Sequence, residues 1–186
     1  MIGYAICASY CSFSSSLAVM EELVRSGEEI QPIISERAYS TDTRFWLSCE
    51  FVSRVESIAG REAIHTIADA EPLGPKRPLD ALIISPCTGN TLAKLASGIT
   101  DSAVTMAAKA HLRQDRPLLI ALATNDAMSQ NLQNIGRLLT RRSVYFTPLR
   151  QDDPVNKPHS LVADFSRVKE SLSAMREGRQ IRPLFV

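Results

Sequence analysis

The residues best suited to chemistry lie in one short segment, Ser85-Pro86-Cys87-Thr88-Gly89-Asn90-Thr91. Its proline ends the apolar run before it, and its glycine permits backbone angles that other residues rarely adopt. Helical spacing begins at about Asn90, and the free N–H groups and dipole of a helix start attract anions. Lys94 lies one turn further along. Helix capping explains Thr88 or Asn90 but not the density of polar groups, so we predict a phosphate or carboxylate site.

A second segment has a similar character. Residues 8–12, Ala-Ser-Tyr-Cys-Ser, also follow an apolar run and precede a helical pattern. Serine hydroxyls at a helix start can add donors to an anion site. Helix capping by Ser12 or Ser14 is the simpler explanation, because a ligand would approach a glycine more closely than it could approach Ala8.

The cysteines and histidines do not form a recognisable metal site. No two cysteines form a Cys-x-x-Cys pair, and the three histidines do not cluster near them in sequence. We therefore predict no metal. A domain of this size does not need disulfides, so we expect reduced thiols in a reducing compartment. The four cysteines are Cys7, Cys11, Cys49 and Cys87.

Strand-like and helix-like patterns alternate along the chain and must position these segments. Short apolar runs predict strands over residues 2–8, 30–34, 63–67, 79–85, 117–123 and 144–146. Apolar residues at helical spacing predict helices over residues 14–26, 43–59, 90–97, 102–113, 128–140 and 161–176. Residues 71–78 hold three prolines and a glycine, so we expect an ordered loop there. We expect an extended edge over residues 181–186.

Strands that are apolar on both faces and alternate with amphipathic helices indicate an α/β fold. We predict a three-layer α/β/α arrangement with a doubly wound parallel sheet of the Rossmann or flavodoxin-like type, formed as a single domain by residues 1–186. Ligands of such sheets bind outside the carboxyl ends of the strands. Four loops should therefore meet around the ligand: residues 8–12, 35–43, 85–91 and 124–128.

Composition and charge exclude some classes of partner. The 186 residues include 21 Lys and Arg against 20 Asp and Glu, and the formal net charge is +1. This balance does not indicate a nucleic-acid partner. The apolar runs are too short to span a bilayer, and the N-terminus reads as a first strand and not as a signal peptide. We expect a cytoplasmic protein with no nucleic-acid or membrane partner.

The central segment also resembles a family motif. Residues 86–101 are similar to Pro-x-Ser/Thr-Ala-Asn-Thr-x-x-Lys-x-Ala-x-Gly-x-x-Asp, found in the flavoprotein family of FMN-binding cysteine decarboxylases, with Gly89 at the alanine position. Residues 125–128, Asn-Asp-Ala-Met, are similar to that family's Met-Asn-x-x-Met segment, with Thr124 at its first methionine. Residues 7–9, Cys-Ala-Ser, stand where the family reads roughly Gly/Thr-Gly-Ser.

Nearly the whole chain resembles a narrower family, the B subunits of dipicolinate synthase. The resemblance is carried by residues 40–45, Ser-Thr-Asp-Thr-Arg-Phe, by residues 70–76, Ala-Glu-Pro-Leu-Gly-Pro-Lys, and by the Thr-Gly-Asn form of the central motif. It implies an oxidoreductase subunit that binds FMN, forms a homo-oligomer and acts with an A subunit that holds NADP. The implied product is pyridine-2,6-dicarboxylate (dipicolinate), made from a dihydrodipicolinate-pathway intermediate in the mother cell of a sporulating bacterium.

The resemblance also implies roles for individual residues. The cofactor-binding residues would be Ser9, Ser35, Ser85, Thr88, Gly89, Asn90, Thr91 and Asn125. Asn125 and Met128 would face the substrate, and Asp101 would lie at a helix start or a subunit contact. Arg44, Lys76 and Arg77 could clamp the carboxylates of a small dicarboxylate substrate, although solvated surface cations are the commoner case. The catalytic residues are not identified.

Three functions stay open from the sequence. The first is a dipicolinate synthase subunit that acts with an A subunit. The second is a stand-alone FMN-dependent decarboxylase, but the family's histidine lies in a different context from His65, for which we expect only a packing or solvent-facing role. The third is a non-catalytic partner that has lost flavin, which Ala8 and the bulky Tyr10 beside the proposed phosphate site favour.

Overall fold

The centre of the molecule is a seven-stranded sheet. The computed structural model describes residues 1–76 and 79–186. The strands are β1 (Ile2–Ile6), β2 (Ile30–Ile34), β3 (Ala81–Cys87), β4 (Leu118–Thr124), β5 (Val144–Phe146), β6 (Leu149–Arg150) and β7 (Leu161–Ala163). The sheet order is β2-β1-β3-β4-β7-β6, and β5 pairs with β4. Strands β1 to β5 are parallel, whereas β7 is antiparallel to both β4 and β6.

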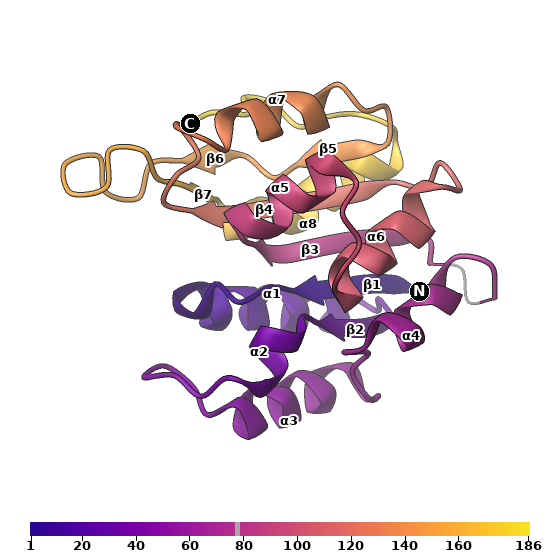
Figure 1. The fold of residues 1–186 in the computed structure, drawn as a ribbon. Helices are drawn as coiled ribbons and strands as arrows, with labels where there is room; N and C mark the ends of the chain where they lie inside the picture. Colours follow the sequence, from indigo (N-terminus) through magenta and orange to yellow (C-terminus); the bar gives the residue numbers. More distant parts are fainter. Residues whose placement is uncertain (77–78) are drawn as a thin grey trace.

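Helices cover both faces of this sheet (Figure 1). The helices are α1 (Phe13–Arg25), α2 (Glu36–Ser40), α3 (Ser48–Ala59), α4 (Ile67–Ala70), α5 (Gly89–Ser97), α6 (Ala103–Leu112), α7 (Leu132–Leu139) and α8 (Val168–Arg176), with single 3₁₀ turns at Tyr10–Ser12, Glu71–Leu73 and Phe165–Arg167. Helices α1 and α8 pack together on one face, and α5 packs against α6 and α7 on the other. The predicted three-layer, doubly wound fold is confirmed.

Strand β1 lies between β2 and β3, so the chain winds away from β1 in two directions. Such a switch point leaves a crevice at the carboxyl ends of the strands, between the loop after β1 and the loop after β3. These are the two segments that the sequence singles out for an anion site. No helix among the described residues is long and apolar enough to cross a membrane.

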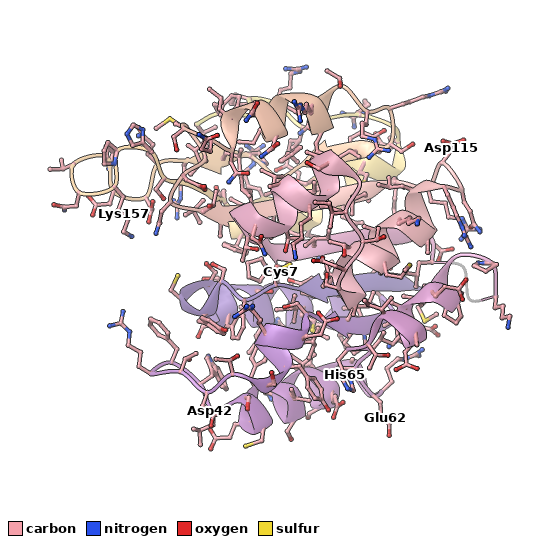
Figure 2. All side chains as sticks on the ribbon, in the orientation of Figure 1. Cys7, Asp42, Glu62, His65, Asp115 and Lys157 are labelled. Carbon is pink, nitrogen blue, oxygen red and sulfur yellow. The ribbon has the colours of Figure 1, made fainter. Side chains whose placement is uncertain are left out.

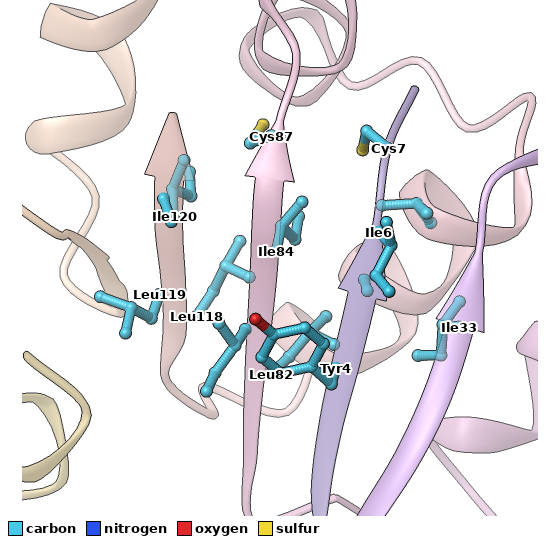
Figure 3. Packing of buried hydrophobic residues seen from close by; sticks show 14 of the residues in the cluster. Tyr4, Ile6, Cys7, Ile33, Leu82, Ile84, Cys87, Leu118, Leu119 and Ile120 are labelled. Carbon is cyan, nitrogen blue, oxygen red and sulfur yellow. The ribbon is translucent and has the colours of Figure 1, made fainter. Parts of the chain in front are cut away.

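A buried tyrosine, Tyr4, links the end of β3 to α1, and Figure 3 shows it among the apolar side chains of the core. The Tyr4 hydroxyl lies 2.9 Å from the carbonyl oxygen of Ser16 and 3.1 Å from Ser85 Oγ, while Ser16 Oγ donates to the Ser85 carbonyl at 2.5 Å. Burial raises the pKa of Tyr4 to about 12, so the phenol stays neutral. The strand end beneath the polar loop is therefore held by buried hydrogen bonds as well as by apolar packing.

The helix predicted over residues 43–59 is wrong in its first turn, because α3 begins only at Ser48. Asp42 Oδ1 accepts hydrogen bonds from the N–H and the hydroxyl of Ser48, at 2.8 and 2.7 Å. Thr43 Oγ1 accepts from the N–H groups of Phe45 and Trp46, each at 3.2 Å. These side chains satisfy backbone groups locally and so compete with a helix.

Two further helices start later than predicted. Helix α7 begins at Leu132, because the N–H of Met128 bonds to His159 O at 3.0 Å and the N–H of Ser129 bonds to Asp126 O at 3.1 Å. The first residues predicted as helix over 161–176 instead form β7, which pairs with the end of β4. Tertiary pairing therefore overrides the local helical pattern in both segments.

The region around α4 differs in smaller ways. The strand predicted over residues 63–67 is reduced to one bridge between Ile33 and Ile64, and Thr66 caps α4 by accepting from the N–H of Asp69 at 3.1 Å. The expected loop over 71–78 begins with a 3₁₀ turn, Glu71–Leu73. The extended edge at the C-terminus is confirmed by a bridge between Leu149 and Phe185.

Candidate functional site

The start of α5 forms the centre of the candidate site. Thr88 caps this helix: its Oγ1 accepts from the N–H of Thr91 at 3.2 Å and lies 3.1 Å from Thr91 Oγ1. Gly89 and Asn90 are the first two helical residues, so their N–H groups have no acceptor within the helix. The positive end of the helix dipole is also directed here. This arrangement can hold an anionic group without any charged side chain.

Gly89 is required by the packing beneath the helix start. A Cβ atom at this position would lie 2.6 Å from Asn131 Nδ2 and 2.8 Å from Asp126 Oδ1, and closer still to Thr124 Oγ1. These three side chains are bonded to one another, because Thr124 and Asn131 both donate to the Asp126 carboxylate. The network cannot give way at one atom without losing hydrogen bonds. Gly89 and Thr124, which both differ from the decarboxylase motif, are thus physically coupled.

Two pockets open on either side of the α5 start. The first has a volume of about 510 Å³ and is lined by Cys7, Ala8, Ser35, Glu36, Arg37, Ile67, Thr88, Asn90, Thr91, Lys94, Asp101 and Ser102. The second has a volume of about 330 Å³ and is lined by Ala8, Ser9, Cys11, Ser12, Thr88, Gly89, Asn90, Ala123, Thr124, Asn125, Asp152, Lys157 and Val162. Ala8, Thr88 and Asn90 belong to both walls. Together the pockets are in the size range of small-molecule sites, roughly 300–1,000 Å³.

The charges in the first pocket are largely balanced within the chain. Glu36 Oε1 accepts from the N–H of Ala103 at 2.9 Å and so helps to cap α6. Lys94 Nζ lies 2.8 Å from Asp101 Oδ2, and this hydrogen bond lowers the pKa of Asp101. The sequence position of Lys94 suggested a free cation beside the anion site, but its ammonium group is already paired with Asp101. The anion-binding capacity of this pocket therefore comes from hydroxyl and backbone N–H groups and from the Arg37 guanidinium.

A projecting loop closes part of the second pocket. Residues 151–160 connect β6 to β7 and extend past the carboxyl ends of the parallel strands, where Figure 2 labels Lys157. Lys157 Nζ lies 3.0 Å from Asp152 Oδ2, and Ser160 Oγ donates to Asp152 Oδ1 at 2.6 Å. The Ser160 and Lys157 hydrogen bonds lower the pKa of Asp152, whose carboxylate in turn raises the pKa of Lys157. An ammonium group is thereby kept at the pocket rim.

Two buried thiols lie at the ends of β1 and β3, below the pockets. The hydrogen bond from Cys87 lowers the pKa of Cys7 against the effect of burial, and Thr91 and Thr88 lower it further. Burial raises the pKa of Cys87 well above its usual value. Across residues 1–76 and 79–186, no group of three or more His, Cys, Asp or Glu side chains could hold a metal ion.

The structure brings most of the predicted cofactor residues together. Ser35 and Thr91 line the first pocket, and the second pocket is lined by Ser9, Gly89 and Asn125. Thr88 and Asn90 line both. Ser85 does not reach either wall, because its side chain is fully buried and bonded to Tyr4. Ser85 can therefore affect a ligand only indirectly, by fixing the position of the loop that follows β3.

The predicted substrate residues do not converge. Arg44 is exposed on the loop before α3, with its guanidinium 4.8 Å from the Phe45 ring centroid, and lines neither pocket. Lys76 is exposed on the segment that leads to the amino end of β3, opposite to the pockets. Neither cation lines a pocket at the start of α5, so their role in binding a dicarboxylate stays a prediction. Met128 is half-buried and also lines neither pocket, and Arg77 lies outside the described residues.

Several pocket residues were missed from the sequence. The first pocket contains three residues that form no motif in the sequence: Glu36, Arg37 and Ser102. The second pocket contains Asp152 and Lys157. Both lie in the hairpin between β6 and β7, which was not predicted because the residues of β7 were assigned to a helix over 161–176. Tyr10 had been expected beside a phosphate. It turns away instead, with its ring 5.4 Å from that of Phe13, and lines neither pocket. His65 stacks on Tyr39 at 3.8 Å, in the packing role expected for it.

Comparison with known proteins identifies the class of this fold and site. The Flavoprotein family model matches residues 2–177, so the chain belongs to the flavoprotein family. Within this class, the chain is 41% identical over 185 residues to the B subunit of dipicolinate synthase from Bacillus subtilis (strain 168), covering 100% of this chain and 92% of that protein. The predicted family is thus confirmed.

Solved structures agree with this assignment. The crystal structure of the dipicolinate synthase B subunit from Bacillus halodurans C matches with a TM-score of 0.91 and 38% identity, over 100% of this chain and 95% of that chain. The FMN-dependent cysteine decarboxylase SpaF matches with a TM-score of 0.69 and 20% identity, over 95% of each chain. The second similarity shows a shared fold alone.

Proposed function

We propose that this chain acts as the B subunit of a dipicolinate synthase, an oxidoreductase that forms pyridine-2,6-dicarboxylate from a cyclic dicarboxylate precursor during sporulation. The observation that carries the proposal is the 41% identity to the B subunit of dipicolinate synthase, which extends over the whole chain. The partner is an A subunit that holds NADP. The chain itself assembles as a homo-oligomer.

The cofactor of this chain is FMN, bound across the two pockets. The start of α5 fits a phosphate, because the N–H groups of Gly89 and Asn90 have no acceptor within the helix and both residues lie at a pocket wall. Hydroxyls of Ser9, Ser35 and Thr91 surround this point. When bound, the flavin supplies a two-electron acceptor for oxidation of the substrate.

The chain's own residues bind and orient the ligands. Asn125 offers an amide at the wall of the second pocket, where the Lys157 ammonium is already paired with the Asp152 carboxylate. Arg37 offers a guanidinium at the wall of the first pocket. A dicarboxylate anion needs such cations for recognition. Asn125 and Arg37 are the side chains positioned at the pocket walls to meet it.

Mixing experiments test which of the two subunits is required for product formation. Dipicolinate formation should be measured with this chain alone, with the A subunit alone and with both together. We expect product at a substantial rate only from the mixture. If the chain alone made dipicolinate at the full rate, the need for a partner would be refuted, and a full rate from the A subunit alone would refute a catalytic share for this chain. Carbon dioxide release by this chain alone would instead indicate a stand-alone decarboxylase.

A further inference from the structure

The thiols of Cys7 and Cys87 have no part in the proposed function. Figure 3 shows them at the neighbouring ends of β1 and β3, turned toward each other. Both are free cysteines and almost fully buried, at 1% and 0% exposure. Whether a disulfide can join these thiols depends on whether Cys7 and Cys87 are direct cross-strand partners in the sheet.

The strand register places the two cysteines opposite each other. Without an irregularity, the pairing of Ala5 with Ile84 would put Pro86, and not Cys87, opposite Cys7. Strand β3 contains a bulge between Ile84 and Cys87. The extra residue turns Cys87 to the face of the sheet on which Ile84 and Cys7 lie.

A backbone hydrogen bond confirms this register. The N–H of Cys7 donates to the carbonyl of Pro86 at 3.1 Å. In the parallel ladder of this sheet, an N–H bonds to the carbonyl just before its partner residue, as when Leu82, the partner of Leu118, donates to Pro117. Cys7 is therefore the direct cross-strand partner of Cys87.

This pairing suits a disulfide bond. Neighbouring strands lie about 4.8 Å apart, which is within the range of about 4.4–6.8 Å between the Cα atoms of bonded cysteines. The strand register places the two side chains on one face of the sheet. Formation of a disulfide therefore requires the two side chains to rotate but leaves the pairing of the two strands unchanged.

Cys7 is suited to react first. Its side chain belongs to the wall of the first pocket, whereas that of Cys87 belongs to neither pocket wall. Neighbouring polar groups, chiefly Cys87, lower the pKa of the Cys7 thiol, whereas burial raises the pKa of Cys87 well above its usual value. A lower pKa favours the thiolate, which is the nucleophilic form of cysteine.

We propose that Cys7 and Cys87 are a redox-active dithiol, oxidised to an intramolecular disulfide by a small-molecule disulfide that enters through the first pocket. The Cys7 thiolate attacks one sulfur of the small disulfide, forming a mixed disulfide and releasing one small thiolate. Cys87 then loses its proton and attacks Cys7 Sγ, which forms the Cys7–Cys87 bond and releases the second small thiol. Two protein thiols are oxidised and one small disulfide is reduced to two thiols.

Oxidation changes the floor of the pocket. Cys7 belongs to the wall of the first pocket, so a disulfide at this position changes the shape and the polarity of that wall. The dithiol would in this way couple the redox state of the protein to the pocket, and the coupling does not depend on which ligand binds there.

The proposal is tested in a full-length variant that carries Cys11→Ser and Cys49→Ser, which removes both exposed thiols. This protein is incubated with oxidised glutathione and then analysed by thiol titration under denaturing conditions and by intact mass. We expect both remaining thiols to disappear, the mass to fall by about 2 Da as two hydrogens are lost, and dithiothreitol to reverse both changes.

Two matched variants resolve the order of the steps. With Cys87→Ser added, Cys7 should hold one glutathione as a stable adduct. With Cys7→Ser added, the Cys87 thiol should react at least about 10-fold more slowly, because it is buried and lacks a thiolate character. Thermal unfolding of each variant verifies that it is folded. Persistence of both thiols, two glutathione adducts without the mass loss, or disulfides between chains would each refute the proposal.

Discussion

Replacing Gly89 by alanine is expected to lower the affinity for FMN by about 100-fold or more, equivalent to about 2.7 kcal/mol. The new Cβ would overlap Thr124, Asp126 and Asn131, which are bonded to one another. Relief requires either loss of these hydrogen bonds or movement of the α5 start, whose N–H groups are the proposed phosphate ligands. Overpacking of this kind also costs about 1–3 kcal/mol of stability. Fluorescence titration of FMN with the purified variant measures the first effect.

Gly136→Ala is the matched control. Gly136 lies inside α7, and a Cβ there would meet no atom within 4 Å. This substitution should leave FMN affinity unchanged and raise the free energy of unfolding by about 0.5–1 kcal/mol, because alanine favours a helix more than glycine does. If Gly89→Ala bound FMN as tightly as Gly136→Ala, the α5 start would not be the phosphate site.

Replacing Thr88 by valine should also weaken FMN binding, by about 10-fold or more, while preserving the shape of the side chain. Thr88 lines both pockets and its hydroxyl caps α5, so loss of the hydroxyl removes the hydrogen bonds to Thr91 and loosens the helix start that carries the proposed phosphate ligands. Loss of a cap costs about 1 kcal/mol of stability. Calorimetric titration with FMN, together with thermal unfolding, separates the two effects.

Thr66→Val provides the comparison for this experiment. Thr66 is also half-buried and caps α4 in the same way, but it lines neither pocket. It should lose a similar amount of stability and retain the affinity of the unaltered protein for FMN. Equal weakening of FMN binding in both variants would mean that the effect of Thr88 is one of general stability and not of the site.

Much of the fold could be predicted from the sequence because the central strands are continuous apolar runs. Buried strands such as β1, β3 and β4 cannot alternate with polar residues, so their patterns are unambiguous. The short strands β6 and β7 were not predicted, since their pairing with β4 is decided by tertiary contacts and leaves little trace in local spacing. Helix starts were misplaced where Asp42 and Thr43 bond to nearby backbone groups.

The candidate site was predictable to the extent that it follows strand ends. The segments after β1 and β3 meet because the switch point lies between these strands, and small polar residues mark both. Lys157 and Asp152 could not be placed, because they enter through a hairpin that was predicted neither as strands nor as a loop over the pocket. The position of Lys76 could not be predicted, because the resemblance marks its segment as characteristic of the family but does not say at which end of the sheet it lies.

The most direct test of the account compares FMN with riboflavin, which lacks the phosphate, in binding to the purified chain. We predict that the chain takes up about one FMN per protomer, with a visible flavin spectrum that survives desalting, and that riboflavin binds at least about 10-fold more weakly because the start of α5 has no phosphate to hold. A colourless protein that takes up no added FMN, or equal affinity for the two flavins, would contradict the account.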